Sequence, residues 1–215
     1  MLQEIIRLQF EENTDYNNPG QAVNQMQSLY ALSKDLYTDS IRFIYELLQN
    51  ADDSNIGESK VKVSVRLIGN NLVIAHNGKP FDERDIQGIC AVNNGTKKQE
   101  TDKTGFKGIG FKSVFGQSDK VTVFSSGEYF RFDESYLHDW KWAGTQESWE
   151  EQSRRLFKFP WQIIPISTKP EEVQPDIHQY LIGTDFTVAT IVEITNIKEA
   201  EIAINELSDK VDMFL

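Results

Sequence analysis

The sequence predicts an α+β protein, a two-layer α/β sandwich in which helices cover one face of a mixed, mostly antiparallel sheet. Two observations support this class. Helical periodicity is concentrated near the two ends of the chain, and hairpin signals fill the middle. Separate runs of helices and strands favour α+β over a doubly wound parallel sheet. With 215 residues, 39% of them hydrophobic, the chain can form one domain with a substantial core.

The predicted helices begin with apolar residues at helical spacing from about Gly20 to Leu36. A second helix is expected from about Ser40 to Asp52, with Thr38 or Asp39 as its cap. The last helix should begin at Asn196, because Asn196 and Glu199 have the spacing of a capping box.

The predicted strands lie between these helices. KVKVSVRLI alternates strictly, GNN is a turn, and LVIAH returns as the next strand. The segment FDERDIQGICAVNN indicates a short helix capped by Asp82. KVTVFSSGEYFRFD is a second hairpin that turns at Ser126 and Gly127, and WQIIPIS and TDFTVATIVEIT are typical of strands.

One domain is expected, with four consecutive parts. These are a helical part (1–55), a core (56–132), a tryptophan-rich insertion (about 133–160), and closing strands with a C-terminal helix (161–215). Because tryptophans are highly buried on average, those of the insertion should pack an inserted helix onto the sheet. We expect this domain to be the N-terminal part of a longer protein.

Composition excludes several functions. The net charge of −11 and the pI near 4.8 make direct nucleic-acid binding unlikely, since an acidic surface repels phosphodiesters. The single Cys90 excludes an internal disulfide and suits a reducing cytoplasm, where we expect the protein. No apolar run reaches the ~20 residues of a membrane span, so no membrane partner is expected.

The stretch TGFKGIGFKS, Thr104 to Ser113, suggests a phosphate-binding loop. It fails as a Walker A motif, because Phe111 stands between the second glycine and Lys112. It fails as a dinucleotide fingerprint, because Ser113 replaces the third glycine. Both motifs also require a buried strand before the loop, and the preceding residues are polar. A long loop that ends at a helix start can still hold an anion on free backbone N–H groups.

The second predicted helix carries a polar stripe. Arg42, Glu46, Asn50 and Asp53 are three or four residues apart and share one face. The side-chain oxygen of Asn50 suits Mg²⁺, and Glu46 is one turn away, where it could deprotonate a water. The alternative is an ordinary Arg42–Glu46 ion pair on an exposed edge.

Taken with the Asn77-Gly78 turn, these features resemble the Bergerat-fold (GHKL) ATPases, such as DNA gyrase, the large heat-shock chaperones, sensor histidine kinases and mismatch-repair ATPases. ELLQNADD resembles the N-box E-x-x-x-N-x-x-D, and GTK followed by GFKGIGF resembles the chaperone-type lid. GTDFTV, Gly183 to Val188, resembles the strand that closes the adenine pocket. LYTDSIRFIYELLQNADD is most similar to the sacsin-type branch.

The resemblance implies ATP and Mg²⁺ as cofactors and assigns a role to each matching residue. Glu46 would be the general base, Asn50 the Mg²⁺ ligand and Asp53 an acidic residue near the nucleoside, with Thr184 reaching adenine. The remaining implied nucleotide-binding residues lie in the second motif and the lid: His76, Asn77, Gly78, Thr96, Lys97, Gly105, Phe106, Lys107, Gly108, Ile109, Gly110 and Phe111.

The second motif departs from the family pattern D-x-G-x-G. Its aspartate, which accepts from the adenine amino group, is His76 here, and its second glycine is Pro80. Neutral histidine can accept one hydrogen bond, whereas protonated histidine only donates. We therefore expect weaker discrimination between ATP and GTP, and a pH dependence near the histidine pKa. The alternative is that His76 only caps a strand, with the base bound by Asp53 and water.

The implied function is slow, Mg²⁺-dependent ATP hydrolysis, in which the nucleotide orders a lid from about Asn93 to Thr104. Lid closure would change contacts with downstream domains of the same polypeptide or with a second copy in a homodimer. The alternative is a nucleotide-binding module that does not hydrolyse and regulates an interaction. A histidine kinase is disfavoured, because no histidine precedes His76.

Overall fold

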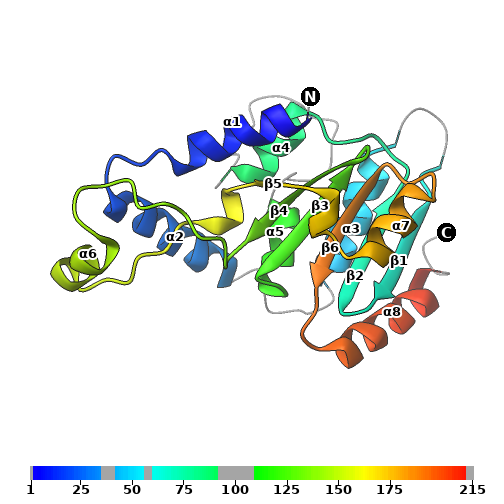
Figure 1. Ribbon diagram of the computed structural model, residues 1–215. Helices are drawn as coiled ribbons and strands as arrows, with labels where there is room; N and C mark the ends of the chain where they lie inside the picture. The colour runs from blue at the N-terminus through cyan, green and yellow to red at the C-terminus, as the bar shows by residue number, and fades with distance from the viewer. Residues whose placement is uncertain (1, 35–41, 56–59, 92–108, 212–215) are drawn as a thin grey trace, which may run out of the picture.

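The computed structural model describes residues 2–34, 42–55, 60–91 and 109–211, and they form the two-layer α/β sandwich that the sequence predicts (Figure 1). The strands lie in the order β1 (Val63–Ile68), β2 (Asn71–His76), β6 (Val188–Glu193), β3 (Lys120–Ser125), β4 (Glu128–Asp133) and β5 (Ile166–Thr168). Every pair of neighbouring strands in this sheet is antiparallel.

Both predicted hairpins are confirmed, and their turns explain why. The β1–β2 turn contains Gly69 at φ 61°, and the β3–β4 turn contains Ser126 at φ 47° and Gly127 at φ 89°. Both central residues of the β3–β4 turn have positive φ, whereas in the β1–β2 turn only the first central residue, Gly69, does. Both arrangements give a two-residue turn whose twist matches that of the flanking strands. Local turn chemistry therefore sets the register of both pairs.

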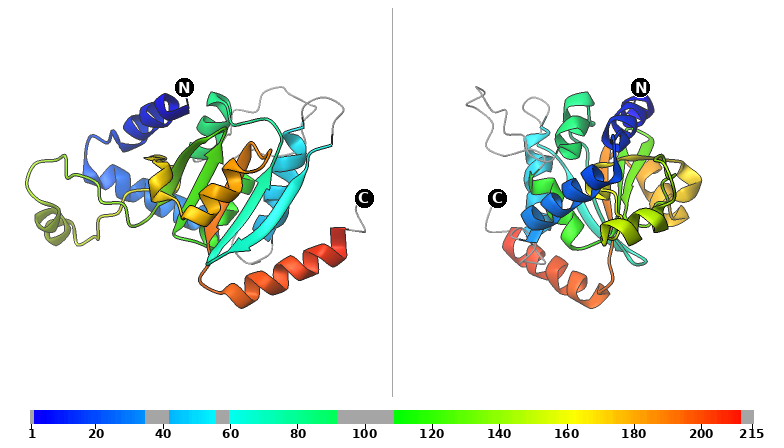
Figure 2. Two further views of the ribbon diagram at one scale, coloured as in Figure 1. Left: turned by 45° about the vertical axis from the view of Figure 1, so that its right-hand side comes forward. Right: turned by 90° about the vertical axis from the view of Figure 1, so that its left-hand side faces the viewer.

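The first face of the sheet is covered by helices α1 (Leu2–Thr14), α3 (Arg42–Asp53), α4 (Glu83–Cys90) and α5 (Ile109–Lys112), with a 3-10 turn at Ser113–Gly116 after α5. Their apolar residues form one cluster with alternate residues of the strands, such as Leu72, Ile74 and Val192. This is the helical layer that the sequence predicts, and Figure 2 shows it from two further sides.

One short helix also lies on part of the second face, which the sequence did not predict. Helix α7 (Pro175–Ile182) packs Ile177 and Leu181 against Val73, Ala75 and neighbouring residues of the sheet. Strands β2 and β6 are largely apolar on both faces because they lie between the helical layer on the first face and α7 on the second.

The tryptophan-rich insertion differs from expectation. Helix α6 (Gln146–Ser153) has no buried residue and lies away from the sheet, near α2 (Pro19–Lys34) (Figure 1). Trp142 donates from Nε1 to the backbone oxygen of Tyr16 at 2.9 Å and packs on the cluster that contains Phe159. The expectation that the insertion packs its helix onto the sheet is therefore wrong: these aromatic residues pack on the α1–α2 segment.

The segment Trp161–Thr168 is a strand only in its last part. Residues Trp161–Ile163 form a 3-10 turn, and β5 begins at Ile166. Pro160 and Pro165 have no backbone N–H, so this segment cannot supply a continuous row of donors to a ladder. Trp161 instead enters the main core, where it is 5% exposed.

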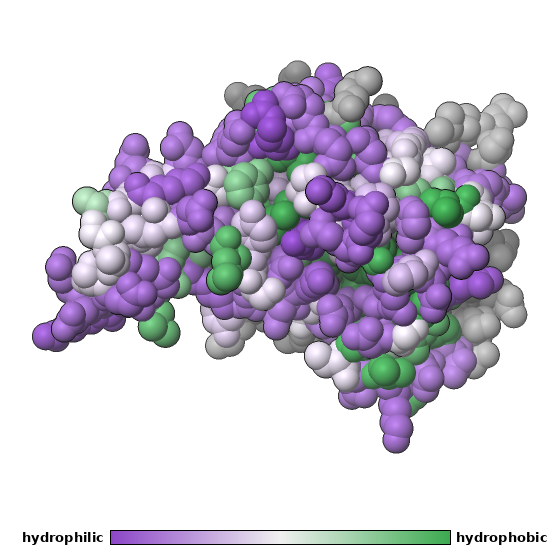
Figure 3. Space-filling view, in the orientation of Figure 1, coloured by the Kyte–Doolittle hydropathy of each residue, from purple (hydrophilic) through white to green (hydrophobic). Residues whose placement is uncertain are grey.

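Helix α8 (Ile197–Val211) lies beyond the β1 edge, and Ile204 packs on the main core while Ile202 remains exposed. The face of the molecule in Figure 3 is largely hydrophilic, with apolar residues over α8 at the lower right. None of the helices in the described ranges combines the length and the apolar character that crossing a membrane requires.

Candidate functional site

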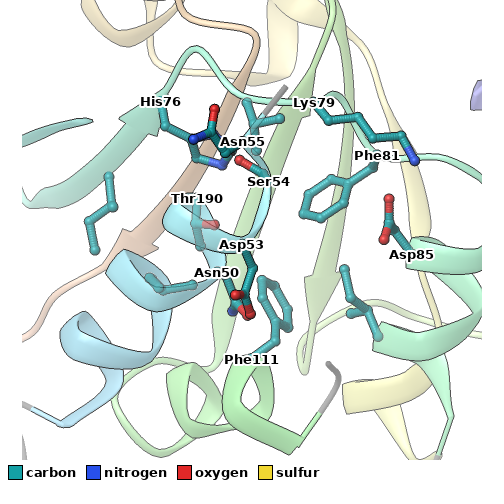
Figure 4. Close-up of a pocket in the computed structure, with 14 residues that line it drawn as sticks. Asn50, Asp53, Ser54, Asn55, His76, Lys79, Phe81, Asp85, Phe111 and Thr190 are labelled. Carbon is teal, nitrogen blue, oxygen red and sulfur yellow. Dashed lines mark hydrogen bonds between the residues drawn. The ribbon is translucent and has the colours of Figure 1, made fainter. Parts of the chain in front are cut away.

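A cavity opens between α3, α4, α5 and the first face of strands β2 and β6 (Figure 4). Its apolar wall consists of Leu47, Ile74, Phe81, Ile89, Phe111 and Val188. Its polar residues are Asn50, Asp53, Ser54, Asn55, His76, Lys79, Asp85 and Thr190. A concave apolar wall beside a few polar groups is typical of a small-molecule site.

Helix α3 supplies the oxygen-bearing side chains. Its buried side, with Phe43, Ile44 and Leu47, packs in the core, so residues Asn50 and Asp53 on the adjoining side face the cavity. Both side chains lie beside Phe111 in Figure 4. The structure therefore brings together two of the residues that the polar stripe predicts.

Glu46 and Arg42, one turn earlier, are not among the cavity-lining residues. Arg42 Nε lies 3.6 Å from Glu46 Oε1, with the Arg42 side chain 55% exposed and the Glu46 side chain 29% exposed. The ion pair of the alternative interpretation is thus present. Such an exposed pair contributes little stability, and it leaves the second carboxylate oxygen of Glu46 for other contacts.

That second oxygen lies against the start of α5. A β carbon built on Gly110 would be 2.4 Å from Glu46 Oε2, which is closer than real β carbons approach other atoms. Gly110 is therefore required for the close approach of this carboxylate to the α5 backbone, next to the cavity residue Phe111. Ile109 is the first residue of α5.

The loop after β2 is fixed by backbone contacts on both sides. Lys79 N–H donates to Ser54 O at 2.8 Å, and Thr187 N–H donates to His76 O at 2.9 Å. A β carbon on Gly78 would lie 1.9 Å from Ser54 Oγ, so a glycine is needed where the loop passes the end of α3. Asn77 accepts from Lys62 N–H at 2.8 Å and does not line the cavity.

His76 lies at the end of β2 and is 8% exposed. Its Nδ1 accepts a hydrogen bond from the Gly78 N–H at 3.2 Å and lies 3.3 Å from Ser54 Oγ. Burial lowers the His76 pKa from 6.5 to about 4, because the charged ring would lose its hydration. The expected pH dependence near the ordinary histidine pKa is therefore wrong for this residue, which is neutral at pH 7.

The start of α4 forms a charged rim. Asp82 accepts from Asp85 N–H at 3.0 Å, and Asp85 accepts from Asp82 N–H at 3.0 Å, so the predicted Asp82 cap is confirmed as a capping box. The Lys79 ammonium bonds to Asp82 and lowers the pKa of that carboxyl to about 2. Lys79 and Asp85 also line the cavity, and sequence analysis did not identify them.

Lys112 joins α5 to the end of α4. Its Nζ donates to Ile89 O at 2.7 Å, and the residue is 7% exposed. Burial lowers the Lys112 pKa to about 8. This bond fixes the last turn of α4 beside the cavity residue Ile89.

The threonine that lines the cavity is Thr190, and not Thr184, which the resemblance assigned to the adenine pocket. Thr184 precedes β6, donates to Leu181 O at 3.2 Å and is not among the cavity-lining residues, whereas Thr190 lines the cavity. Thr190 is the antiparallel partner of Ile74, so the two residues share a sheet face. The sequence does contain a signal for Thr190, because it is a polar residue within the apolar run of β6.

Six residues assigned by resemblance belong to the lid motif. Thr96, Lys97, Gly105, Phe106, Lys107 and Gly108 lie outside the described residues, as does the expected lid from 93 to 104. In the described part of that motif, Ile109 to Phe111, Phe111 lines the cavity.

The residues that are placed fit a nucleotide with Mg²⁺. Asn50 and Asp53 offer amide and carboxylate oxygens, which are the ligands Mg²⁺ prefers, while substrate phosphates commonly supply the rest. In the ranges that the structure describes, no group of three or more His, Cys, Asp or Glu residues could hold a metal alone. The donor set therefore suits a cation that arrives with its own oxygen ligands.

Comparison with known proteins identifies the family. The sacsin domain profile matches residues 32–186, which is well over half of the chain. Protein NO VEIN of Arabidopsis thaliana is 39% identical over 108 residues, covering 50% of this chain and 4% of that protein. Sacsin of Homo sapiens is 30% identical over 141 residues, covering 56% of this chain and 3% of sacsin. The chain spans only a small fraction of the length of either relative. The matched range also includes α3, β2 and α4, which line the cavity. Because the profile covers well over half of its residues, the chain belongs to the sacsin domain family.

Proposed function

We propose that this chain is an ATP-binding domain of the GHKL type, which hydrolyses ATP slowly with Mg²⁺ and thereby changes its contacts with other domains of a larger protein. One observation carries the proposal. The Asn50 and Asp53 side chains face a cavity with an apolar wall on β2 and β6, one turn after a glutamate whose carboxylate lies against Gly110.

Each part of the cavity has a role in this proposal. The apolar wall of Ile74, Val188 and Phe111 would accept the base, since a planar ring excludes water from such a surface. Asn50 would hold the cation that accompanies the phosphates, and Asp53 would lie near the nucleoside. Bound MgATP supplies the phosphoryl group to be cleaved, and Glu46 would orient the attacking water and take its proton.

A non-hydrolysing nucleotide-binding module is the second candidate, and a specific observation favours it. Arg42 already contacts the Glu46 carboxylate, and Glu46 does not line the cavity itself. In that case nucleotide would stabilise an interaction surface without being consumed. Partners in either case are other domains of the polypeptide or a second copy of the chain.

Calorimetric titration with ATP, ADP and GTP, with and without Mg²⁺, tests the proposal. We expect saturable, Mg²⁺-dependent binding of ATP that Asn50→Ala weakens and Asn70→Ala leaves unchanged. Asn70 is a matched control, because it lies in the β1–β2 turn at the other end of β2 from His76. No binding of any nucleotide at millimolar concentration would refute both candidates.

Phosphate release separates the two candidates. Glu46→Gln keeps the shape of the side chain and removes its basicity. We expect turnover to fall roughly 10²-fold or more while ATP affinity is retained, because general bases contribute about that factor. Turnover that is unchanged in Glu46→Gln would remove Glu46 as the base, and no turnover in the unmodified protein would favour the non-hydrolysing module.

A further inference from the structure

We infer that His76 makes the base end of this cavity select a hydrogen-bond acceptor, and therefore favours 6-oxo purine nucleotides (inosine or guanosine triphosphate) over ATP. The inference rests on the proposed function, because it concerns the base of the nucleotide bound there. It reverses the role in which a neutral His76 would accept a hydrogen bond from an amino group.

The first step is the tautomer of His76, which the hydrogen-bond network assigns. Gly78 is buried, and its N–H points at His76 Nδ1 at 3.2 Å. A buried backbone N–H needs an acceptor, so Nδ1 must carry a lone pair and not a proton. Ser54 does not oppose this, since its hydroxyl donates to Ala51 O at 2.6 Å and is farther, 3.3 Å, from Nδ1.

The second step follows from the chemistry of imidazole. A neutral ring carries one proton, so the proton of His76 must be on Nε2. Nε2 has no hydrogen-bond partner among the described residues, and His76 lines the cavity. The ring nitrogen left for a bound molecule is thus an N–H donor, and burial among apolar residues such as Ile74 and Val188 strengthens its demand for an acceptor.

The third step compares the purines. Guanine presents acceptors at both O6 and N7, whereas adenine presents an acceptor at N7 and a donor amino group at position 6. A 6-amino group that met the Nε2–H would place two donors together and leave both unpaired. Inosine differs from guanosine only by lacking the 2-amino group, so it isolates the contribution of the 6-oxo group.

The test is a competition experiment in which ATP, GTP and inosine triphosphate displace one fluorescent nucleotide, with Mg²⁺ at pH 7.5. We expect the 6-oxo nucleotides to bind more tightly than ATP by roughly tenfold, the ratio that one hydrogen bond commonly provides. His76→Asp replaces the donor by an acceptor and should reverse the ratio. His178→Asn is the matched control, because His178 bonds to Tyr129 on the second face of the sheet.

Two outcomes overturn the inference and are distinct from failure of the proposed function. Equal or tighter binding of ATP in the unmodified protein, or a ratio unchanged by His76→Asp, removes the inference alone. Absence of binding by all three nucleotides removes the proposed function as well. If His76→Asp does not fold, long-range ¹H–¹⁵N correlation spectra of the unmodified protein still decide the tautomer, and a proton on Nδ1 would overturn the inference without any ligand.

Discussion

Gly110 lies so close to Glu46 that a β carbon on the glycine would be 2.4 Å from Glu46 Oε2. The contact joins α3 to the first turn of α5, which are far apart in the sequence. It fixes where a carboxylate can lie relative to the cavity next to Phe111. A glycine in a motif that resembles a phosphate-binding loop therefore has a second purpose, which is to leave room for a side chain.

Gly110→Ala should displace the Glu46 carboxylate. We expect ATP turnover to fall roughly 10²-fold with little change in ATP affinity, because a small misplacement of a reacting group costs about that factor. Phosphate release and calorimetry on the same samples measure the two quantities. Gly20→Ala, in the first turn of α2, is the control. Turnover that survives Gly110→Ala would show that the position of this carboxylate does not matter.

Gly78 and Ser54 should be energetically coupled. A β carbon on Gly78 would lie 1.9 Å from Ser54 Oγ, so Gly78→Ala must push the loop away from α3. We expect a loss of about 1–3 kcal/mol in the free energy of unfolding, the usual cost of overpacking.

Ser54→Gly removes the obstructing hydroxymethyl group, so Gly78→Ala should cost much less in that background. Urea unfolding of the four proteins of this double-mutant cycle gives the coupling energy. Additive effects of the two substitutions would show that the loop avoids the clash by moving freely.

Much of the fold was predictable, because its signals are local. The turn at Ser126 and Gly127, the Asp82 cap and the alternation of β1 each depend on a few adjacent residues. Helix α7 was not predicted, although Pro175 at its first position and the spacing of Ile177 and Leu181 are helix signals. The position of the tryptophan-rich insertion depends on its contacts with the α1–α2 segment. These contacts join residues far apart in the sequence, so no local pattern could predict them.

The polar cavity-lining residues that come from α3 could be predicted from the sequence. Those that come from paired strands were harder to predict, because their position depends on which strands are neighbours. Asn50 and Asp53 share a face of α3 by helical periodicity alone. Thr190 could be placed in the cavity only by knowing that it pairs with Ile74 across β2 and β6. The tautomer of His76 depends on the Gly78 N–H, which becomes available only when the loop has folded back on the ring.

Acid should destabilise the fold through His76. Its pKa is about 4 in the folded protein and 6.5 when unfolded, so the unfolded chain binds more protons as the pH falls. The contribution of neutral His76 to the free energy of unfolding is therefore fully present above pH 6.5. Between pH 6.5 and 4 this free energy falls by about 3 kcal/mol. The charged residues lining the same cavity are Asp53, Lys79 and Asp85.

Thermal unfolding at pH values from 7 to 4 measures this loss, and His76→Gln should flatten the curve. His138 has a pKa lowered to about 4 by burial and the nearby Lys141, so His138→Gln should flatten it further. If the unfolding temperatures of both variants and of the unmodified protein had the same pH dependence, the acid sensitivity would not come from these two histidines.

Lys112 should make the protein more stable in mild alkali. Its pKa is lowered from 10.5 to about 8 by burial, so above pH 8 the unfolded chain binds more protons and the folded state gains. Cys90, whose pKa burial raises from 9.0 to about 12, opposes this gain above pH 9. We therefore expect the free energy of unfolding to rise by about 1 kcal/mol between pH 8 and 9.

Lys112→Met should abolish that rise, because it removes the titrating amine while keeping an unbranched apolar chain in its place. It should also lower stability at pH 7 by up to about 3 kcal/mol, since Ile89 O loses a charged donor. Cys90→Ala should instead extend the rise toward pH 10.5. Lys120→Met, at an exposed position of β3, is the control. Urea unfolding from pH 7 to 10.5 measures the free energy of unfolding of each protein. A free energy that does not change between pH 8 and 9 in the unmodified protein would mean that Lys112 titrates as an exposed lysine does.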